Sequence, residues 1–231
     1  MSTPANDSDG SISKVDFYDG ATLILTSPGT ANPYTGTWNN VGAGVHILTA
    51  VATDNLGATT TSAPVSITVM PAGTVNVALD ANGGIATASS TYDSRFAPSG
   101  ANNGDRKGLS WGSGGGWADA TANAYPDWLE VDFSGSRVIH EIDVVTIQDD
   151  YQSPVEPTSS MTFTLYGLTD FQVQYWTGTQ WLDVPSGVVT GNNHILRQFM
   201  FSDIATTRIR VLVNGALNNY SRVTEIEAWG M

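Results

Sequence analysis

The sequence predicts an all-β protein, and three observations carry that prediction. Charged residues make up only 13% of the 231 residues, and 24 residues are glycine. Valine, threonine, isoleucine, tryptophan and tyrosine are frequent, and these residue types favour the pleated surface of a sheet. Apolar residues alternate with polar ones in short runs, and no segment sustains the helical period of about 3.6 residues. Short strands joined by tight turns therefore account for the chain.

The first 70 residues contain a series of such runs. They cover residues 12–18, 22–25, 35–38, 45–52 and 65–69. Turn sequences separate them, at Asp19-Gly20, Asn32-Pro33, Gly42-Ala43-Gly44 and Asn55-Leu56-Gly57. Strands of this length at this spacing are typical of a β-sandwich.

A change in composition divides the chain, although its length alone allows one large domain or two small ones. Proline and glycine at Met70-Pro71-Ala72-Gly73-Thr74 end the first pattern. We therefore predict a first domain over residues 1–70, a short linker over residues 71–75 and a second domain over residues 76–231. The second domain resumes the alternation, most clearly in residues 137–147.

Charge and cysteine content exclude several classes of protein. The formal net charge is −13, so the phosphate backbone of a nucleic acid would be repelled. Cysteine is absent, which excludes a disulfide framework and a thiol nucleophile. No apolar run approaches the roughly 20 residues that cross a bilayer, so no membrane partner is expected. The polar residues 1–6 lack the features of a signal peptide, and we interpret the chain as a fragment of a longer exported protein, extracellular or at the cell surface.

Two segments far apart in the sequence suggest a cation site. Residues 100–111 form a loop rich in glycine, asparagine and aspartate, and residues 222–230 form a strand in which Glu225 lies among apolar residues. Such loops present backbone carbonyls at low steric cost, and calcium takes about six to eight oxygens in a flexible geometry. Brought together, the two segments would form an oxygen cage for a hard cation.

The same two segments belong to a set of five motifs. The other three are Pro126-Asp127-Trp128-Leu129-Glu130-Val131-Asp132-Phe133, Thr169-Asp170-Phe171-Gln172-Val173-Gln174-Tyr175-Trp176 and Arg208-Ile209-Arg210-Val211-Leu212-Val213. In this order they resemble a discoidin domain, also called the coagulation factor V/VIII type C domain, whose bacterial members include family 32 carbohydrate-binding modules. The resemblance covers roughly residues 76–231 and implies a galactose-binding-like fold, an eight-stranded β jelly roll.

The first domain is similar to another family. Asp7-Ser8-Asp9-Gly10, Val15-Asp16-Phe17-Tyr18 and Ala50-Val51-Ala52-Thr53-Asp54-Asn55-Leu56-Gly57 resemble the bacterial immunoglobulin-like repeats found beside catalytic domains in secreted glycoside hydrolases. In that family one or two strands precede the Asp-Ser-Asp-Gly turn, whereas only six residues precede it here. We therefore expect an immunoglobulin-like β-sandwich that lacks its first strand or two, with fewer than seven strands and an exposed sheet edge.

The discoidin resemblance implies a structural Ca²⁺. Its ligands would be the carbonyl of Gly100 or Ala101, the Asn103 side chain, an oxygen of Asp105, a carbonyl or hydroxyl between Gly108 and Ser110, the Thr224 carbonyl and the Glu225 carboxylate. Most relatives have aspartate at the position of Asn103, and a neutral amide there weakens calcium binding unless Asp105 compensates. The alternative is a glycine-rich turn closed by hydrogen bonds, with Glu225 solvated.

Sugar binding needs an aromatic face for the apolar side of a pyranose and planar polar groups for its hydroxyls. The loops of the expected jelly roll offer seven candidates, namely Tyr92, Arg95, Trp117, Tyr125, Tyr151, Tyr220 and Arg222. Trp117 is the leading platform because the preceding glycines leave nothing to bury it, and the alternative is that it packs over the mouth of the barrel. The guanidinium of Arg95 or Arg222 could donate two hydrogen bonds to vicinal hydroxyls of a sugar. The alternative is that each arginine forms an ion pair with a carboxylate, that of Asp93, Asp149 or Glu227.

Catalysis by this chain is not expected. Glycoside hydrolysis needs two carboxylates that face each other across the scissile bond. A pair of this kind could be drawn only from Asp149, Asp150 and Glu156. Asp149 and Asp150 are adjacent in the sequence, and the side chains of adjacent residues usually point in opposite directions. His46, His140 and His194 are too widely spaced in the sequence for a transition-metal motif.

These observations predict a noncatalytic carbohydrate-binding accessory module of a secreted bacterial carbohydrate-active enzyme. Its partners would be a polysaccharide or oligosaccharide and a catalytic domain on the parent chain. Fucose- and galactose-binding relatives use a histidine with one or two arginines, and no histidine falls in these loops, so the sugar stays open. The alternative function is a cell-surface adhesion or spacer module that binds a protein partner.

Overall fold

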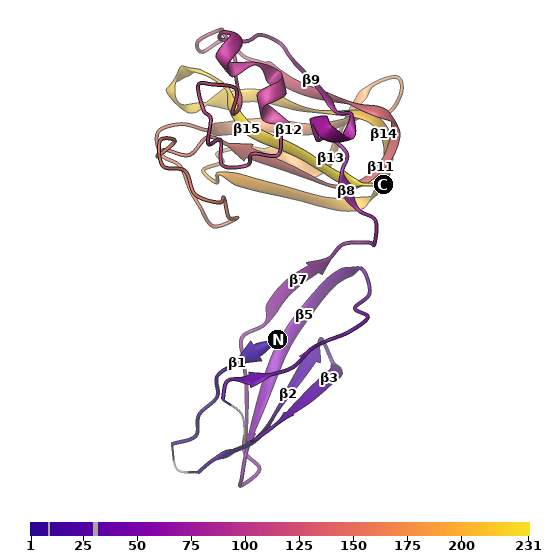
Figure 1. The fold of residues 1–231 in the computed structure, drawn as a ribbon, viewed down its shortest axis with the longest axis vertical. Helices are drawn as coiled ribbons and strands as arrows, with labels where there is room; N and C mark the ends of the chain where they lie inside the picture. The colour runs from indigo at the N-terminus through magenta and orange to yellow at the C-terminus, as the bar shows by residue number, and fades with distance from the viewer. Residues whose placement is uncertain (9, 30–31) are drawn as a thin grey trace. The chain divides into compact units, whose positions relative to one another are not determined.

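A computed structural model describes residues 1–8, 10–29 and 32–231 of the chain. Its contacts divide the protein into two compact units, Met1–Ala72 and Gly73–Met231, here called unit 1 and unit 2. Every regular element in the described residues is a β-strand or a short 3₁₀ helix (Figure 1), which confirms the all-β prediction. Asp9, one residue of the Asp-Ser-Asp-Gly turn, lies outside the described residues.

Unit 1 is built on one sheet with the strand order β3-β2-β5-β6, to which β7 adds by pairing with β5. A second sheet consists of β1 and β4 alone. Val15 and Phe17 on β2 form the buried core with Tyr34 on β4. The strands are β1 Ser2–Thr3, β2 Ile12–Asp19, β3 Thr22–Pro28, β4 Tyr34–Thr35, β5 Gly44–Asp54, β6 Thr59–Thr61 and β7 Val65–Val69.

The prediction that unit 1 has fewer than seven strands is wrong, because its described residues contain seven. The sequence pattern missed β1 and β6, which are two and three residues long and so too short for a readable alternation, while the predicted run 35–38 overlaps β4 at Thr35. Ser2 pairs with Thr35 and Thr3 with Tyr34, and the amide of Gly36 donates to the carbonyl of Met1 at 3.1 Å. The residues before the Asp-Ser-Asp-Gly turn therefore supply a strand themselves.

Unit 2 contains eight antiparallel strands, as expected for a jelly roll. The strand order is β10-β15-β11-β14-β12-β13, while β8 pairs with β15 and β9 with β11. Val75, which the sequence placed in the linker, pairs with Gly230 and belongs to β8. The strands are β8 Val75–Asn76, β9 Ile85–Ala88, β10 Trp117–Ala118, β11 Asp127–Thr146, β12 Leu168–Trp176, β13 Trp181–Val189, β14 Leu196–Ala216 and β15 Arg222–Gly230. The 3₁₀ helices are η1 Asp80–Asn82, η2 Ser94–Phe96, η3 Pro98–Ala101 and η4 Leu217–Asn219.

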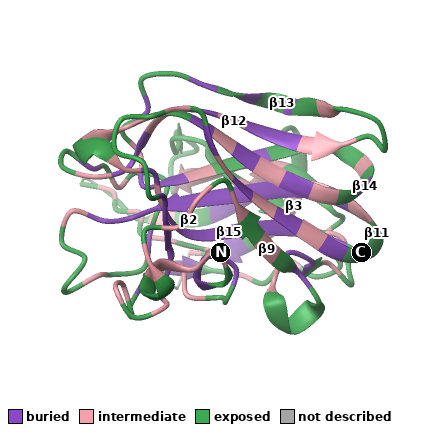
Figure 2. Ribbon diagram, turned by 90° about the horizontal axis from the view of Figure 1, so that it is seen from above, coloured by how far each residue is buried: buried purple, intermediate pink, exposed green. Residues whose placement is uncertain are grey.

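The 20-residue strand β11 lies within the unit 2 sheet, between β15 and β14. Its first part pairs with β9 and its second part with β15. Between Ile139 and Glu141 the register against β15 shifts, so that His140 is an extra residue. Because side chains alternate along a strand, one extra residue exchanges the two faces. Figure 2 shows the resulting bands of buried and partly buried residues along the unit 2 strands.

The largest cluster of buried apolar residues in unit 2 is here called the main core. Before the bulge the odd-numbered Leu129 and Val131 lie in it, and after the bulge the even-numbered Ile142 and Val144 do. The odd-numbered side chains after the bulge therefore face the opposite side of the sheet. Val145 packs there in a separate cluster with three other residues, Phe163, Ile195 and Leu196.

Candidate functional site

Loops of unit 2 form a depression of about 270 Å³ whose lining is mainly aromatic. We call it the aromatic depression, and its lining residues are Tyr92, Arg95, Phe96, Trp111, Ala118, Ile147, Tyr151, Tyr166, Tyr220 and Arg222. The segments that supply them are widely separated in the sequence and meet only in the fold. The structure thus brings together five of the seven sugar-contacting candidates, Tyr92, Arg95, Tyr151, Tyr220 and Arg222.

Four rings of the aromatic depression contact one another in series. Tyr92 packs edge to face on Tyr220, with ring centroids 5.3 Å apart and an interplanar angle of 89°. On its other side Tyr92 meets Phe96 at 5.8 Å, and Phe96 meets Trp111 at 5.2 Å. Such contacts hold each ring in place, while Tyr92 remains 51% exposed. The series therefore offers a fixed apolar surface that is open to a ligand.

Arg222 lies between two tyrosine rings. Its Cζ atom is 5.3 Å from the centroid of Tyr166 and 5.4 Å from that of Tyr220. Nη1 donates to the carbonyls of Leu217 at 3.2 Å and Tyr220 at 3.1 Å, and Nη2 donates to that of Asn218 at 3.1 Å. Burial lowers the pKa of the Arg222 guanidinium. The side chain thus fixes the turn around η4 and places a cation at the depression.

Arg95 is held differently, because it pairs with a carboxylate. Its Nη2 donates to Oδ2 of Asp93 at 2.7 Å, and its Nε lies 3.1 Å from each of the two oxygens. The side-chain hydrogen bond from Arg95 is the main cause that lowers the pKa of Asp93. The alternative in which Arg95 pairs with Asp93 therefore holds, and the charge of this guanidinium is locally neutralised.

Trp117 does not lie at the surface, and the prediction that it forms an exposed platform is wrong. The residue is fully buried in the main core, and its indole N–H donates to the carbonyl of Ser90 at 2.8 Å. The preceding glycines have another role. A Cβ on Gly116 would lie 2.5 Å from Cζ3 of Trp111, so this glycine makes room for the Trp111 ring.

Tyr125 is also absent from the described lining of the aromatic depression. It packs against the main core, and its hydroxyl accepts from the amide of Ala216 at 3.1 Å. Phe96, Trp111 and Tyr166 line the depression but were not predicted. Trp111 ends the glycine-rich loop already singled out in the sequence, so its position was a usable signal. For Tyr166 the sequence carries no such signal.

The candidate cation site joins loop residues 100–111, here called the cation loop, to β15. Glu225 is fully buried, and its Oε1 accepts a hydrogen bond of 3.0 Å from the amide of Gly104. Oε2 has no hydrogen-bond partner among the described residues. Burial raises the pKa of Glu225 to about 8. The alternative in which Glu225 is solvated is therefore wrong.

The other side chains of the cation loop mostly close the loop itself. Oδ1 of Asn103 accepts from the amide of Asp105 at 2.8 Å, and Oδ2 of Asp105 accepts from the amide of Leu109 at 2.6 Å. The amide of Gly108 donates to the carbonyl of Asp105, and Gly100 is buried in η3. Within the described residues no group of three or more His, Cys, Asp or Glu side chains is placed to hold a metal ion.

Thr224 neighbours Glu225 and contributes its hydroxyl to the same region. Its Oγ1 donates to the carbonyl of Val145 at 3.1 Å and lies 3.3 Å from that of Arg106. A cation held here would depend on backbone carbonyls and on the carboxylate of Glu225.

Beside the cation loop lies an acidic cluster of three buried carboxylates, Glu141, Asp143 and Glu227. Arg106 covers it, with Nη2 donating to Asp143 at 2.9 Å and Nε 3.5 Å from Glu227. Burial is the main cause that raises the pKa of each carboxyl, to about 7 for Glu141 and Glu227. Because the residues are 2 to 4% exposed, no substrate reaches them.

Asp149, one of the three carboxylates considered above for catalysis, has a structural role. Its oxygens accept hydrogen bonds from the amide and hydroxyl of Thr164 at 2.7 and 2.9 Å and from the amide of Leu165 at 3.0 Å. Partial burial works to raise its pKa, but these hydrogen bonds outweigh burial and lower it. A carboxyl that holds its charge in this way is a poor general acid.

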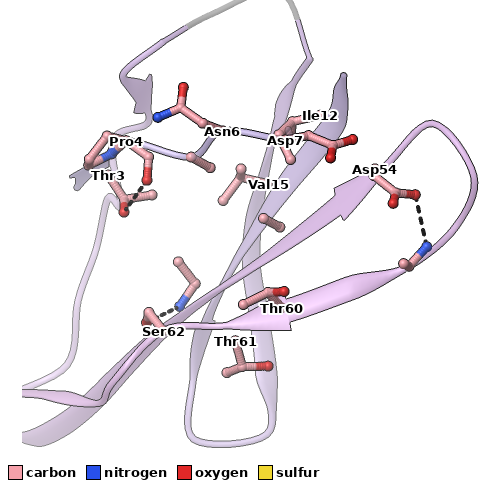
Figure 3. A pocket seen from close by; sticks show the side chains of 14 residues that line it. Thr3, Pro4, Asn6, Asp7, Ile12, Val15, Asp54, Thr60, Thr61 and Ser62 are labelled. Carbon is pink, nitrogen blue, oxygen red and sulfur yellow. Dashed lines mark hydrogen bonds between the residues drawn. The ribbon is translucent and has the colours of Figure 1, made fainter. Parts of the chain in front are cut away.

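Unit 1 carries a depression of its own, of about 290 Å³ (Figure 3). Ile12 and Val15 are part of its apolar lining, and Asp54 lies at its edge. The carboxylate of Asp54 is engaged by its own turn, accepting from the amide of Ala58 at 2.9 Å. None of the described residues that line it is aromatic, lysine or arginine. Among the described residues it therefore lacks an aromatic face on which a sugar ring could stack.

Comparisons with known proteins agree with this description of the two units. Residues 2–50 match the family model of the bacterial Ig domain. No curated protein matches the sequence. Solved structures share the fold of unit 2. The match of residues 2–50 to a bacterial Ig domain, followed by a β-sandwich with the fold of carbohydrate-binding modules, confirms the predicted order of the two folds.

Three of the solved structures illustrate the match. Chitosan-binding module 1 from a chitosanase/glucanase of Paenibacillus sp. IK-5 is 20% identical, with 68% of this chain and 99% of that chain covered and a TM-score of 0.51. A fucose binding module of Streptococcus pneumoniae is 18% identical, with 71% and 100% covered and a TM-score of 0.51. The lectin domain of lectinolysin, solved with Lewis B antigen, is 15% identical, with 68% and 97% covered and a TM-score of 0.51.

No described helix is long and apolar enough to span a membrane.

Proposed function

We propose that unit 2 is a noncatalytic carbohydrate-binding module and that the aromatic depression is its sugar site. The observation that carries this proposal is the series of contacting rings that ends beside Arg222. The apolar face of a pyranose stacks on such rings, and a fixed guanidinium orients its polar substituents. Binding at one such shallow site is weak, because sugar hydroxyls exchange water for protein hydrogen bonds.

The wider context of the chain is part of the same proposal. The matched modules are described as binding chitosan, fucose or Lewis B antigen, and a bacterial Ig domain precedes unit 2. An accessory role on a secreted bacterial carbohydrate-active enzyme accounts for both features. The module would then hold a catalytic domain of the parent chain near its polysaccharide outside the cell.

A structural Ca²⁺ between the cation loop and β15 is a second part of the proposal. The residues present fit a hard cation, because Glu225 buries an oxygen that lacks a hydrogen-bond partner among the described residues. The carboxylate of Glu225, the carbonyl of Thr224 and oxygens of the cation loop at Gly100, Asn103, Asp105 and Gly108 would hold it. The ion would supply charge compensation and loop closure, with no part in chemistry.

A glycan microarray on the purified chain tests the sugar site. We expect specific hits that disappear in Tyr92→Ala and Tyr220→Ala. Val188→Ala is the matched control, because Val188 is 58% exposed on unit 2 and absent from the described lining of the aromatic depression. A blank array with the folded wild-type chain would contradict the proposal and favour an adhesion or spacer module that binds a protein partner.

A further inference from the structure

The aromatic depression contains two guanidinium groups, and only one of them has a carboxylate partner. Arg95 forms an ion pair with Asp93 at 2.7 Å. Arg222 takes part in none of the ion pairs within the described residues. Among the described residues that line the depression, Arg222 therefore contributes a positive charge that no ion pair neutralises, although the chain as a whole has a formal net charge of −13.

The carboxylate that acts on Arg222 from nearby is that of Asp119, which is fully buried. Its Oδ1 accepts from the amide of Ser221 at 2.6 Å, and its Oδ2 accepts from the amide of Thr121 at 2.7 Å. Asp119 is thus committed to the backbone and does not form an ion pair with Arg222. The rings that flank the Arg222 guanidinium are those of Tyr166 and Tyr220.

A guanidinium carries five N–H donors, and Arg222 gives three of them to the carbonyls of Leu217, Asn218 and Tyr220. Described residues leave two donors unused, one on Nε and one on Nη2. A carboxylate or sulfate accepts two such donors at once, which a hydroxyl does less well. The three carbonyl contacts also fix the group in advance, so that little conformational entropy is lost on binding.

The surroundings of Arg222 strengthen its attraction for an anion. Burial works against its charge, as the lowered pKa indicates, because fewer water molecules solvate the cation. A ligand anion would restore that lost solvation at an effective dielectric constant below that of water. The overall negative charge of the chain has the opposite effect at long range and disfavours densely charged polyanions.

We propose that the aromatic depression binds a saccharide that bears an isolated acidic group, a carboxylate or a sulfate ester, which Arg222 receives while the sugar ring stacks on Tyr92 and Tyr220. This inference rests on the proposed function and narrows its ligand. Recognition is local: the guanidinium of Arg222 binds one acidic group of the ligand, and the neighbouring sugar residues of that ligand are neutral.

Matched saccharides test the inference by titration calorimetry on the purified chain. Each set has one hexopyranose core whose C6 group is an unmodified hydroxymethyl group, a carboxylate or a hydroxymethyl group esterified with sulfate. We expect one of the acidic members to bind about tenfold more tightly than the neutral member, which corresponds to about 1.4 kcal/mol, because a hydrogen bond to a charged group is stronger than one between neutral groups. The comparison of the two acidic members distinguishes carboxylate from sulfate.

Arg222→Gln should remove the preference for the acidic member, so that the acidic and neutral members bind the folded variant with equal affinity. The double variant Asp93→Asn/Arg95→Gln is the matched control, because it removes this ion pair as a whole without changing the net charge, and the preference should persist. Since Arg222 also fixes the turn around η4, circular dichroism must first show that the variant folds. A salt series on the wild-type chain needs no variant: the preference should shrink as sodium chloride rises.

The outcomes separate this inference from the proposed function. Equal or tighter binding of the neutral member, or a preference unchanged in folded Arg222→Gln, overturns the acidic ligand but leaves a carbohydrate-binding module. Tighter binding of a densely sulfated polysaccharide than of the singly charged saccharide overturns the local recognition. The absence of binding by every member, together with a blank array, overturns both.

Discussion

Gly104 and Glu225 lie 121 positions apart in the chain, and the amide of Gly104 donates a hydrogen bond of 3.0 Å to Oε1 of Glu225. This contact attaches the cation loop to a strand in the interior of unit 2. The second oxygen of the same carboxylate is buried and has no hydrogen-bond partner among the described residues. One side chain thus both closes the loop and leaves an oxygen for a cation.

Removal of calcium should destabilise unit 2. A metal that binds only the folded state stabilises it by about 2.7 kcal/mol at a concentration 100 times its Kd. In a unit of this size we expect EDTA to lower Tm by several degrees, about 2–4 °C for each kcal/mol. Glu225→Gln, which keeps the shape but not the charge, should melt at the same temperature with and without EDTA. Differential scanning calorimetry is the measurement, and a wild-type Tm unaffected by EDTA contradicts the calcium site.

Replacement of Trp117 should affect stability rather than sugar contact. Trp117→Ala removes a fully buried indole, and such truncations cost about 3–5 kcal/mol of the free energy of unfolding. Tyr92→Ala, at a site 51% exposed, should cost much less while removing sugar binding. Urea unfolding followed by tryptophan fluorescence compares the two. A Trp117 variant as stable as the wild type would show that this side chain is not core.

The glycine run before Trp117 should matter for the position of Trp111. Gly116 has φ 148°, and a Cβ there would meet the Trp111 ring at 2.5 Å. Gly114 has φ 95° but nothing within 4 Å of an added Cβ, so it shares the backbone strain without the clash. We expect Gly116→Ala to weaken glycan binding severalfold more than Gly114→Ala, measured by calorimetry on both folded variants. Equal affinities would mean that the Trp111 ring does not contribute to the ligand surface.

His46 should make the stability of unit 1 depend on pH. The hydrogen bond with Asp19 and then that with the Gly42 carbonyl raise the pKa of His46 above its ordinary value of 6.5. The folded state therefore holds the proton more tightly than the unfolded state does. The resulting stability is complete below about pH 6.5 and is lost as pH rises through the raised pKa. Thermal melting of unit 1 should show this fall, and His46→Asn should flatten it; an unchanged slope in the variant would exclude His46 as its source.

The sequence predicted the strands of unit 2 well because each long strand has an alternating pattern and a strong apolar face. It predicted the contact between the cation loop and Glu225 through a family resemblance, since no local pattern joins residues so far apart. The short strands β1 and β6 could not be predicted, because two or three residues carry no alternating pattern, and β1 pairs with residues distant in the sequence. The strand count for unit 1 failed for that reason.

The aromatic residues show a second limit. Trp111 and Trp117 flank the same glycine run, and composition alone cannot tell which ring is buried. Strand pairing decides which ring is buried. Trp117 belongs to β10 and pairs with Val223 of β15, whereas Trp111 remains in the loop beside Phe96. Likewise, the tyrosines of the aromatic depression could be recognised from the sequence as aromatic residues in loops. The inward position of Tyr125 could not, because it depends on a hydrogen bond with Ala216.

The bulge at His140 limits how β11 tolerates changes in length. Deletion of this one residue would move Ile142 out of the main core and turn Glu141 and Asp143 into it. The same slip would displace Val145 from its place opposite Glu225 and shift the start of the segment that reaches Ile147 in the aromatic depression. Insertions and deletions among homologous chains should therefore be confined to the loops, while β11 keeps a constant number of residues.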